Sequence, residues 1–216
     1  EHTGATSRRG FSPKQASLQA TYDDVIQLFL AAKMPITPTF GLGGAGLREI
    51  VAHDTTLRSD PRFAMYPPWL VASVTGGGGG GRGGRGGRGS AAPAAAAPAN
   101  PLAGIDPSNA YSMVMRILKG GGSVLTGTDT PLAPNLNGEL VTFVNAGMTP
   151  YQALRAATVE PAKALGIDAG TIEAGKLADL VVLDGNPLTD VTATVRVRQV
   201  MANGKVYALA DLLAPR

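Results

Sequence analysis

The sequence predicts an α/β protein whose pattern of elements changes near Gly166. Before that point, a helix that starts at Asp106-Pro107 leads through a glycine stretch into the apolar pair Val124-Leu125 and then a polar loop. Helix, strand and loop in this order are the repeating unit of a parallel α/β architecture. After Gly166, short β runs around an Asn203-Gly204 turn predict an antiparallel β module.

Composition excludes several kinds of protein. With 216 residues and a hydrophobic fraction of 44%, the chain is long enough to bury a core of one or two domains. No run approaches the roughly 18 apolar residues of a membrane span, so no membrane partner is expected. Without cysteine, the chain has neither a disulfide nor a thiolate metal site. The chain begins with Glu1, and we expect it to be a fragment or a processed product.

The net charge of +3 comes from one tract. Residues 76–89 contain only glycine and arginine, and residues 90–100 are mostly alanine and proline. This composition predicts a disordered insertion at 75–100, because it cannot bury enough apolar area to offset its chain entropy. Arg-Gly-Gly repeats also occur in RNA-binding tails, but three arginines without aromatic neighbours make nucleic acid an unlikely partner.

The first segment predicts a helix, a strand and a loop. A helix capped by Thr21 ends at Met34-Pro35, and residues 36–40 form a short strand that Pro38 weakens. The predicted buried face of this helix repeats at i, i+3, i+4 and i+7: Val25, Leu28, Phe29 and Ala32. Residues 41–46 are glycine-rich without a phosphate-binding pattern, which predicts a flexible loop.

The stretch that follows this loop contains a histidine and a proline pair. A short helix is expected over residues 47–53, with His53 at the surface. Residues 67–70 (PPWL) predict a rigid turn.

Asp129 is the candidate catalytic residue. It follows the apolar pair at 124–125, and Gly127 marks a place where the backbone turns or approaches another segment closely. Pro131 then stops the strand. In α/β barrels, chemistry is done at the carboxyl ends of the strands. Taken alone, Asp129 is either such a residue or a turn cap.

After Asp129, the sequence predicts further helices and strands from short patterns of neighbouring residues. Residues 138–146 predict a helix, and Thr149-Pro-Tyr-Gln152 predicts a capping box that starts the next one. A short helix at 161–165 closes at Gly166. Then follow a turn at 171–176 and β runs at 178–184, 195–201 and 205–209.

Three motifs together resemble the C-terminal part of the amidohydrolase superfamily, in its imidazolonepropionase-like and prolidase-like branches. They are residues 125–131 (LTGTDTP), residues 146–158 (AGMTPYQALRAAT), and residues 175–184 (GKLADLVVLD) with Asn186-Pro187. The resemblance is dense over residues 106–209 and looser over residues 1–40.

The resemblance implies a metal-dependent hydrolase with a (β/α)8 TIM-like barrel and a small composite β-sandwich domain. Residues 1–165 would supply about strands 6 to 8 of the barrel, and residues 166–216 a β-sandwich segment. Asp129 would follow the eighth strand, bind or approach the metal and shuttle a proton. Taken alone, His2 is more simply a solvated residue near the terminus, but the resemblance favours it as the metal-ligating histidine after the sixth strand.

The implied chemistry is hydrolysis of a C–N bond in a small molecule or peptide, such as an Xaa-Pro dipeptide or a cyclic amide. A divalent metal lowers the pKa of bound water to about 7, and a carboxylate beside that water takes its proton. Histidine and carboxylate ligands suit one or two zinc ions, with iron or manganese as alternatives.

The chain also departs from the family pattern. The family has a His-x-His pair after its first strand, whereas this chain has two histidines in all and no such pair. We therefore expect a C-terminal fragment that is inactive alone and needs the missing N-terminal barrel half. The alternative is a non-catalytic remnant that binds RNA or another partner through the arginine tract. Substrate, compartment and oligomeric state, including a homo-oligomeric parent, stay open.

Overall fold

The computed structural model describes residues 23–40, 45–75, 107–129 and 132–213. His2, Thr21 and nearly all of the predicted insertion lie outside these residues. The elements, in chain order, are α2 (Asp23–Ala31), α3 (Ala45–His53), η3 (Thr55–Ser59), η4 (Pro61–Met65), α4 (Pro68–Thr75), α5 (Pro107–Lys119), α6 (Asn135–Asn145), α7 (Pro150–Ala157), α8 (Val159–Leu165), β1 (Leu180–Leu183), η5 (Val191–Val195), β2 (Val197–Ala202), β3 (Lys205–Ala208) and α9 (Leu209–Leu213).

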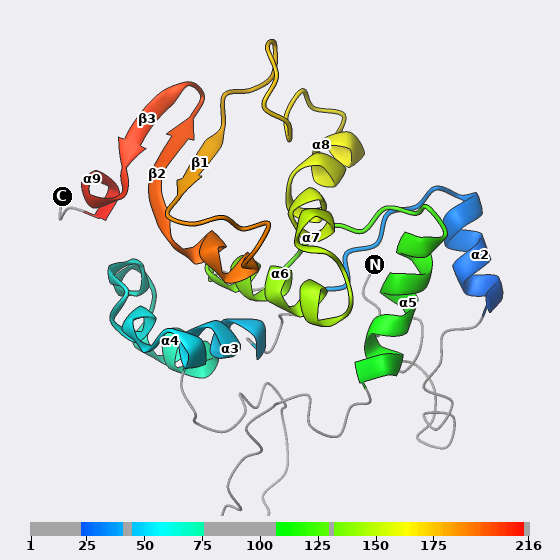
Figure 1. The fold of residues 1–216 in the computed structure, drawn as a ribbon, viewed down its shortest axis with the longest axis horizontal. Helices are drawn as coiled ribbons and strands as arrows, with labels where there is room; N and C mark the ends of the chain where they lie inside the picture. The colour runs from blue at the N-terminus through cyan, green and yellow to red at the C-terminus, as the bar shows by residue number, and fades with distance from the viewer. Residues whose placement is uncertain (1–22, 41–44, 76–106, 130–131, 214–216) are drawn as a thin grey trace, which may run out of the picture.

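Two extended segments meet in parallel at the centre of the helical part. The backbone N–H of Ile36 donates to the Ser123 carbonyl at 3.1 Å, and the N–H of Leu125 donates to the Ile36 carbonyl at 2.8 Å. This bridge pairs Ile36 with Val124, and Figure 1 shows the two segments leaving α2 and α5 side by side. The predicted parallel neighbourhood is therefore confirmed.

The two predicted strands are nevertheless shorter than expected. Within the described residues, each is reduced to the single bridge between Ile36 and Val124. Pro38 has no N–H to donate to a ladder, and Thr39 leaves the extended region with a φ of 50°. The sequence predicted that Pro38 weakens the strand at 36–40, and the pairing found there is indeed short.

The main core surrounds this bridge. Ile36 and Val124 are buried together with side chains from α5, α6 and α7, among them Val114, Ile117, Phe143 and Ala153. On α2 the predicted stripe is partly wrong, because Ile26 and Phe29 are buried whereas Leu28 is 64% exposed. The helix turns this face toward the core that it shares with α5, which amphipathic spacing alone did not identify.

A second cluster packs α3 and α4 beside α6. Its buried members are Leu47, Val51, Phe63, Leu70 and Leu132. Gly46 was predicted to lie in a flexible loop, but it is buried in the first turn of α3, whose predicted helix is confirmed. The predicted turn at 67–70 is wrong, since Pro68 is the first residue of α4, a position that proline favours.

The local end signals are confirmed. Gly121 ends α5 with a φ of 82°, and Gly166 ends α8 with a φ of 67°. At the start of α7, the N–H of Gln152 donates to Thr149 Oγ1 at 3.2 Å, and the N–H of Thr149 donates to Gln152 Oε1 at 2.9 Å. Both halves of the predicted capping box are therefore present.

The C-terminal part is a three-stranded antiparallel sheet in the order β1-β2-β3. Ala202 pairs with Lys205 across a two-residue turn. Asn203 and Gly204 have φ angles of 49° and 77°, as a type I′ turn requires. Val195 was expected in a strand, but it is buried at the end of η5.

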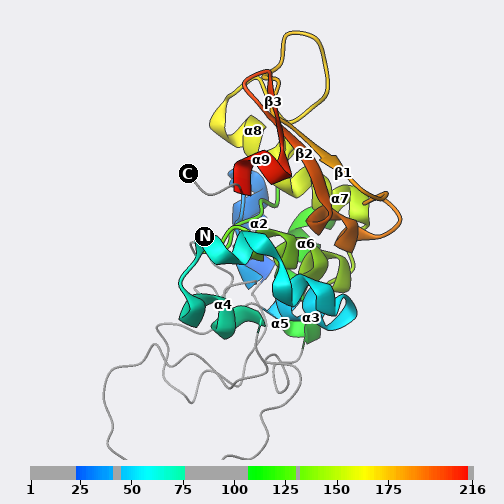
Figure 2. The same ribbon diagram turned by 90° about the vertical axis from the view of Figure 1, so that its left-hand side faces the viewer.

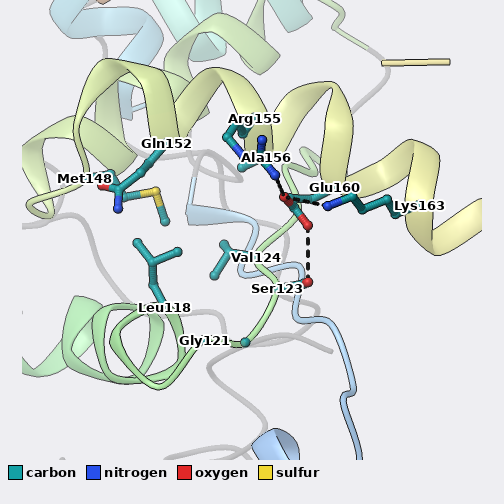
Figure 3. A pocket seen from close by; sticks show the side chains of 11 residues that line it. Leu118, Gly121, Ser123, Val124, Met148, Gln152, Arg155, Ala156, Glu160 and Lys163 are labelled. Carbon is teal, nitrogen blue, oxygen red and sulfur yellow. Dashed lines mark hydrogen bonds and ion pairs between the residues drawn. The ribbon is translucent and has the colours of Figure 1, made fainter. Parts of the chain in front are cut away.

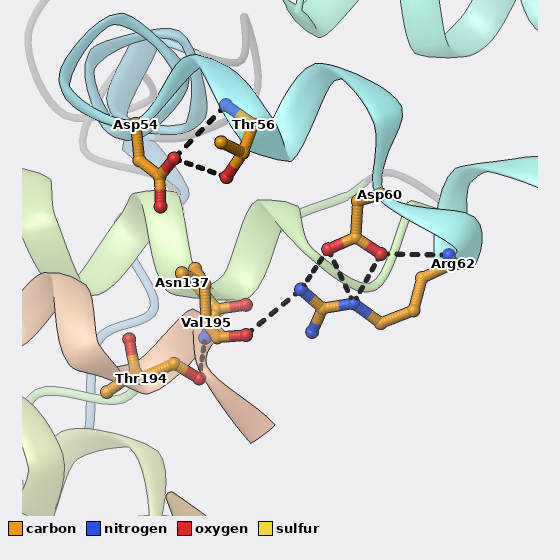
Figure 4. A network of polar contacts seen from close by, with 7 residues as sticks. All are labelled: Asp54, Thr56, Asp60, Arg62, Asn137, Thr194 and Val195. Atoms are coloured by element: carbon orange, nitrogen blue, oxygen red, sulfur yellow. Dashed lines mark hydrogen bonds and ion pairs between the residues drawn. The ribbon is translucent and has the colours of Figure 1, made fainter. Parts of the chain in front are cut away.

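A polar network joins η5 to the helical part (Figure 4). Arg62 pairs with Asp60 and donates to the carbonyl of Val195 at 3.0 Å, while Asn137 donates to the carbonyl of Thr194 at 3.1 Å. Burial alone would raise the pKa of Asp60, but hydrogen bonds from Arg62 and the charge of its guanidinium hold that pKa below its ordinary value. The ionised pair thus fixes η5, and with it the entry to β2.

Among the residues whose placement is described, no helix combines the length and apolar character needed to cross a bilayer.

Candidate functional site

Asp129 lies past the carboxyl end of the extended segment that contains Val124. It is exposed, and its φ of 48° places its backbone in the left-handed region. That conformation is uncommon for residues other than glycine, although aspartate and asparagine tolerate it best. At the end of the neighbouring segment, Thr39 has a similar φ of 50°. Both parallel segments thus end in strained backbone, a feature that clusters at functional sites.

Gly127 brings these two ends together. A Cβ atom at position 127 would lie 2.3 Å from Cγ2 of Thr37 and 3.2 Å from Cγ2 of Thr39. No side chain fits at the first distance, so glycine permits the two segments to touch. This confirms the predicted close approach at Gly127, and it places Asp129 two residues beyond the contact.

The chain is anchored again soon after Asp129. Leu132 is fully buried in the second cluster, beside Phe63 and Leu70. The N–H of Ala133 donates to the hydroxyl of Tyr66 at 3.2 Å. Tyr66 and residues on η4 and α4 therefore hold Leu132 and Ala133, the two residues shortly before α6. Tyr66 had no distinguishing signal in the sequence.

A buried acidic side chain contacts the end of the 36–40 segment. Glu139 on α6 is 0% exposed, and its Oε1 accepts the N–H of Phe40 at 3.0 Å. The sequence pattern did not identify Glu139 as a site residue. Its one signal was a charged residue inside the apolar run of the predicted helix at 138–146.

The described residues do not complete a metal site. They contain no group of three or more His, Cys, Asp or Glu side chains close enough to hold an ion. His53 is exposed at the end of α3, as expected, and His2 lies outside the described residues. A zinc site needs three or four protein ligands, and Asp129 supplies only one of them. A metal shared by His2 and Asp129 stays a prediction.

A pocket of about 340 Å³ lies at the other end of the Val124 segment (Figure 3). Glu160 is its most connected polar residue: it accepts from Ser123 Oγ at 3.3 Å and from Arg155 at 2.6 Å, and Lys163 lies 3.9 Å away. Leu118, Val124 and Met148 supply apolar lining. Because Ser123 precedes the bridge and Asp129 follows it, this pocket is separate from the candidate catalytic end.

Comparisons with known proteins give one family match and one partial relative. Residues 108–207 match the profile of the Amidohydrolase family. An adenine deaminase from Methanosphaera stadtmanae is 43% identical over 61 residues, which are 28% of this chain and 10% of that protein.

Solved structures resemble nearly the whole chain. A Xaa-Pro dipeptidase with bound methionine in the active site aligns over 90% of this chain and 42% of its own, with a TM-score of 0.55 and 21% identity. A molinate hydrolase aligns over 91% of this chain and 38% of its own, with a TM-score of 0.51 and 22% identity. At this identity the likeness establishes the fold alone. The chain spans less than half the length of either protein.

Proposed function

The chain belongs to the amidohydrolase superfamily and has part of a TIM-barrel-type hydrolase fold, and from this premise we propose that it is the C-terminal portion of a metal-dependent hydrolase of C–N bonds. The observation that carries the proposal is the position of Asp129. The residue is exposed at the carboxyl end of a segment in parallel pairing with its neighbour, where barrel enzymes do their chemistry. The profile match over residues 108–207 includes it.

Asp129 is the proposed proton shuttle. Its carboxylate accepts a proton from the attacking water as the new C–O bond forms, and then donates that proton to the nitrogen as the C–N bond breaks. The exposure of Asp129 leaves it open to water and substrate. The close contact at Gly127 lies two residues before it, and the buried Leu132 lies three residues after it.

His2 and Asp129 are the proposed metal ligands from this chain. Zinc suits such donors, with iron or manganese as alternatives, and one or two ions are compatible with them. Because the whole sequence has two histidines and no His-x-His pair, the remaining ligands in this proposal come from the N-terminal part of a longer protein.

The partner that completes the fold is the N-terminal half of the barrel. In this proposal residues 1–165 are the barrel part, and residues 166–216 form a segment of a composite β-sandwich. Two observations support it. Val181 on β1 and Val206 on β3, which the register places on opposite faces of the sheet, are 56% and 52% exposed, and the parallel pairing in the described part is limited to one bridge. Exposed apolar side chains and unpaired strand edges are both costly to leave in water, and additional protein packed around them would cover both.

The proposed substrate carries an amide or peptide bond, as in an Xaa-Pro dipeptide or a cyclic amide. The similar structures include a Xaa-Pro dipeptidase, and the proton shuttle suits a nitrogen leaving group.

The test compares hydrolysis by two proteins on one panel. The zinc-loaded full-length protein and the 216-residue chain are each incubated with Xaa-Pro dipeptides, N-acyl amino acids and cyclic amides, and amine release is followed. We expect turnover by the full-length protein on at least one class and none by the chain alone. Robust turnover by the chain alone would refute the claim that its site is incomplete. No turnover of any C–N substrate by the full-length protein would refute the hydrolase.

A further inference from the structure

Glu139 is a buried carboxylate with no role in the proton transfer described above. It lies in the second turn of α6 and is 0% exposed. Burying a carboxylate is costly unless hydrogen bonds compensate for the lost water. A residue of this kind therefore has a specific task in holding the structure or the site.

Its hydrogen bond joins parts of the chain that are far apart in sequence. Oε1 of Glu139 accepts the N–H of Phe40 at 3.0 Å, across 99 residues. One turn further along α6, the ring of Phe143 packs edge-on against the ring of Phe40, with centroids 6.2 Å apart. Two side chains of α6 thus fix the end of the segment that begins at Ile36.

The fixed segment in turn supports the one that bears Asp129. Phe40 directly follows Thr39, whose methyl group lies with that of Thr37 against the backbone at Gly127. Asp129 is two residues beyond Gly127. The chain then enters α6 at Asn135, one turn before Glu139. The helix that receives the Asp129 segment therefore also pins the segment beside it.

We propose that Glu139 is a positioning residue for Asp129, which holds the 36–40 segment so that Gly127 and Asp129 rest against a fixed surface. The inference depends on the proposed function, since it takes Asp129 as the proton shuttle. Small displacements of catalytic groups are costly, because a shift of about 1 Å can lower a rate by about 100-fold.

The test uses two substitutions in the full-length protein. Glu139→Leu keeps most of the side-chain volume but removes the acceptor, whereas Glu139→Gln keeps a carbonyl oxygen for the N–H of Phe40. We expect Glu139→Leu to lower kcat about tenfold with KM within about twofold, and Glu139→Gln, which keeps an acceptor, to lower kcat only about threefold. Rates are corrected for the folded fraction.

Glu49→Gln is the matched control. Glu49 is exposed on α3 and accepts from Asn145 on α6 at 2.8 Å, so it also bridges to α6 but away from Phe40. It should leave kcat unchanged. Equal losses in both Glu139 variants, or a normal kcat in Glu139→Leu, would overturn the inference.

Hydrogen exchange gives a second readout if Glu139→Leu does not fold. In Glu139→Gln an amide oxygen replaces the carboxyl oxygen as the acceptor and alters this bond, so the Phe40 amide should exchange faster and kcat should fall about threefold. Faster exchange with unchanged kcat would contradict a role in positioning, and unchanged exchange would show that the bond does not hold Phe40.

The Asp129→Asn variant separates this inference from the proposed function. If Asp129→Asn stays active, the proposed function itself fails. If Asp129→Asn is inactive while both Glu139 variants have a normal kcat, only the positioning role of Glu139 fails.

Discussion

Replacing Asp129 with asparagine in the full-length protein is expected to lower kcat for C–N bond hydrolysis by about 100-fold or more, the scale of general acid–base catalysis. Asparagine has nearly the same shape but cannot take a proton from water. It also tolerates the left-handed backbone that Asp129 adopts, with its φ of 48°. The fold should therefore survive, and the melting temperature should stay close to that of the parent.

Asp168→Asn is the control for this substitution. Asp168 is a surface aspartate whose side chain is 86% exposed, and its ion pair with Lys176 lies in the C-terminal segment. The same change there should leave kcat within about twofold of the parent, as for most surface substitutions. A near-normal kcat in Asp129→Asn would remove Asp129 from the mechanism.

Gly138→Ala is expected to lower the free energy of unfolding by about 2 kcal/mol, the net of two opposing effects. In an ordinary helix this change stabilises by about 1 kcal/mol, because alanine is the better helix former. Here a Cβ atom at position 138 would lie 2.4 Å from the backbone N of Leu47 and 3.0 Å from the carbonyl carbon of Gly46. Backbone atoms cannot rotate away, so α3 and α6 must separate, and overpacking of this kind costs about 3 kcal/mol.

Urea unfolding of the full-length protein measures the effect. Leu136→Ala is a control on the same helix, since Leu136 is 39% exposed and its truncation brings no atom toward α3. It should change stability by less than about 1 kcal/mol. A more stable Gly138→Ala variant would show that the contact between α3 and α6 is looser than the structure has it.

The features that the sequence predicted correctly depend on neighbouring residues. Gly121 and Gly166 end helices because glycine alone adopts a positive φ without strain. The capping box at Thr149 and the turn at Asn203-Gly204 involve residues three or fewer positions apart. Such signals carry their own physical cause and need no knowledge of the rest of the fold.

The features that it missed depend on distant contacts. Leu28 fits a helical stripe, yet it is exposed because α2 turns Ile26 and Phe29 toward the core shared with α5. The parallel strands were expected to be longer, but Pro38 has no N–H to donate and Thr39 leaves the extended region, so the pairing in the described part stops at one bridge.

The candidate site divides in the same way. The close approach at Gly127 was readable from a glycine that follows an apolar pair, whereas the catalytic role of Asp129 stays a prediction. Glu139 and Tyr66 were not readable in this way, because their partners, Phe40 and Ala133, lie 99 and 67 residues away. His2 lies outside the described residues, so its role as a metal ligand stays a prediction.

The central claim is that this chain is the C-terminal part of an amidohydrolase whose site is completed by preceding sequence. Reading the coding sequence upstream of Glu1 tests it most directly. The account predicts an open reading frame that continues upstream, with a His-x-His pair at the end of a predicted strand and a further histidine about two strand–helix units before His2. A start codon immediately upstream of Glu1 would contradict it, because the metal ligands could then never be supplied within one chain.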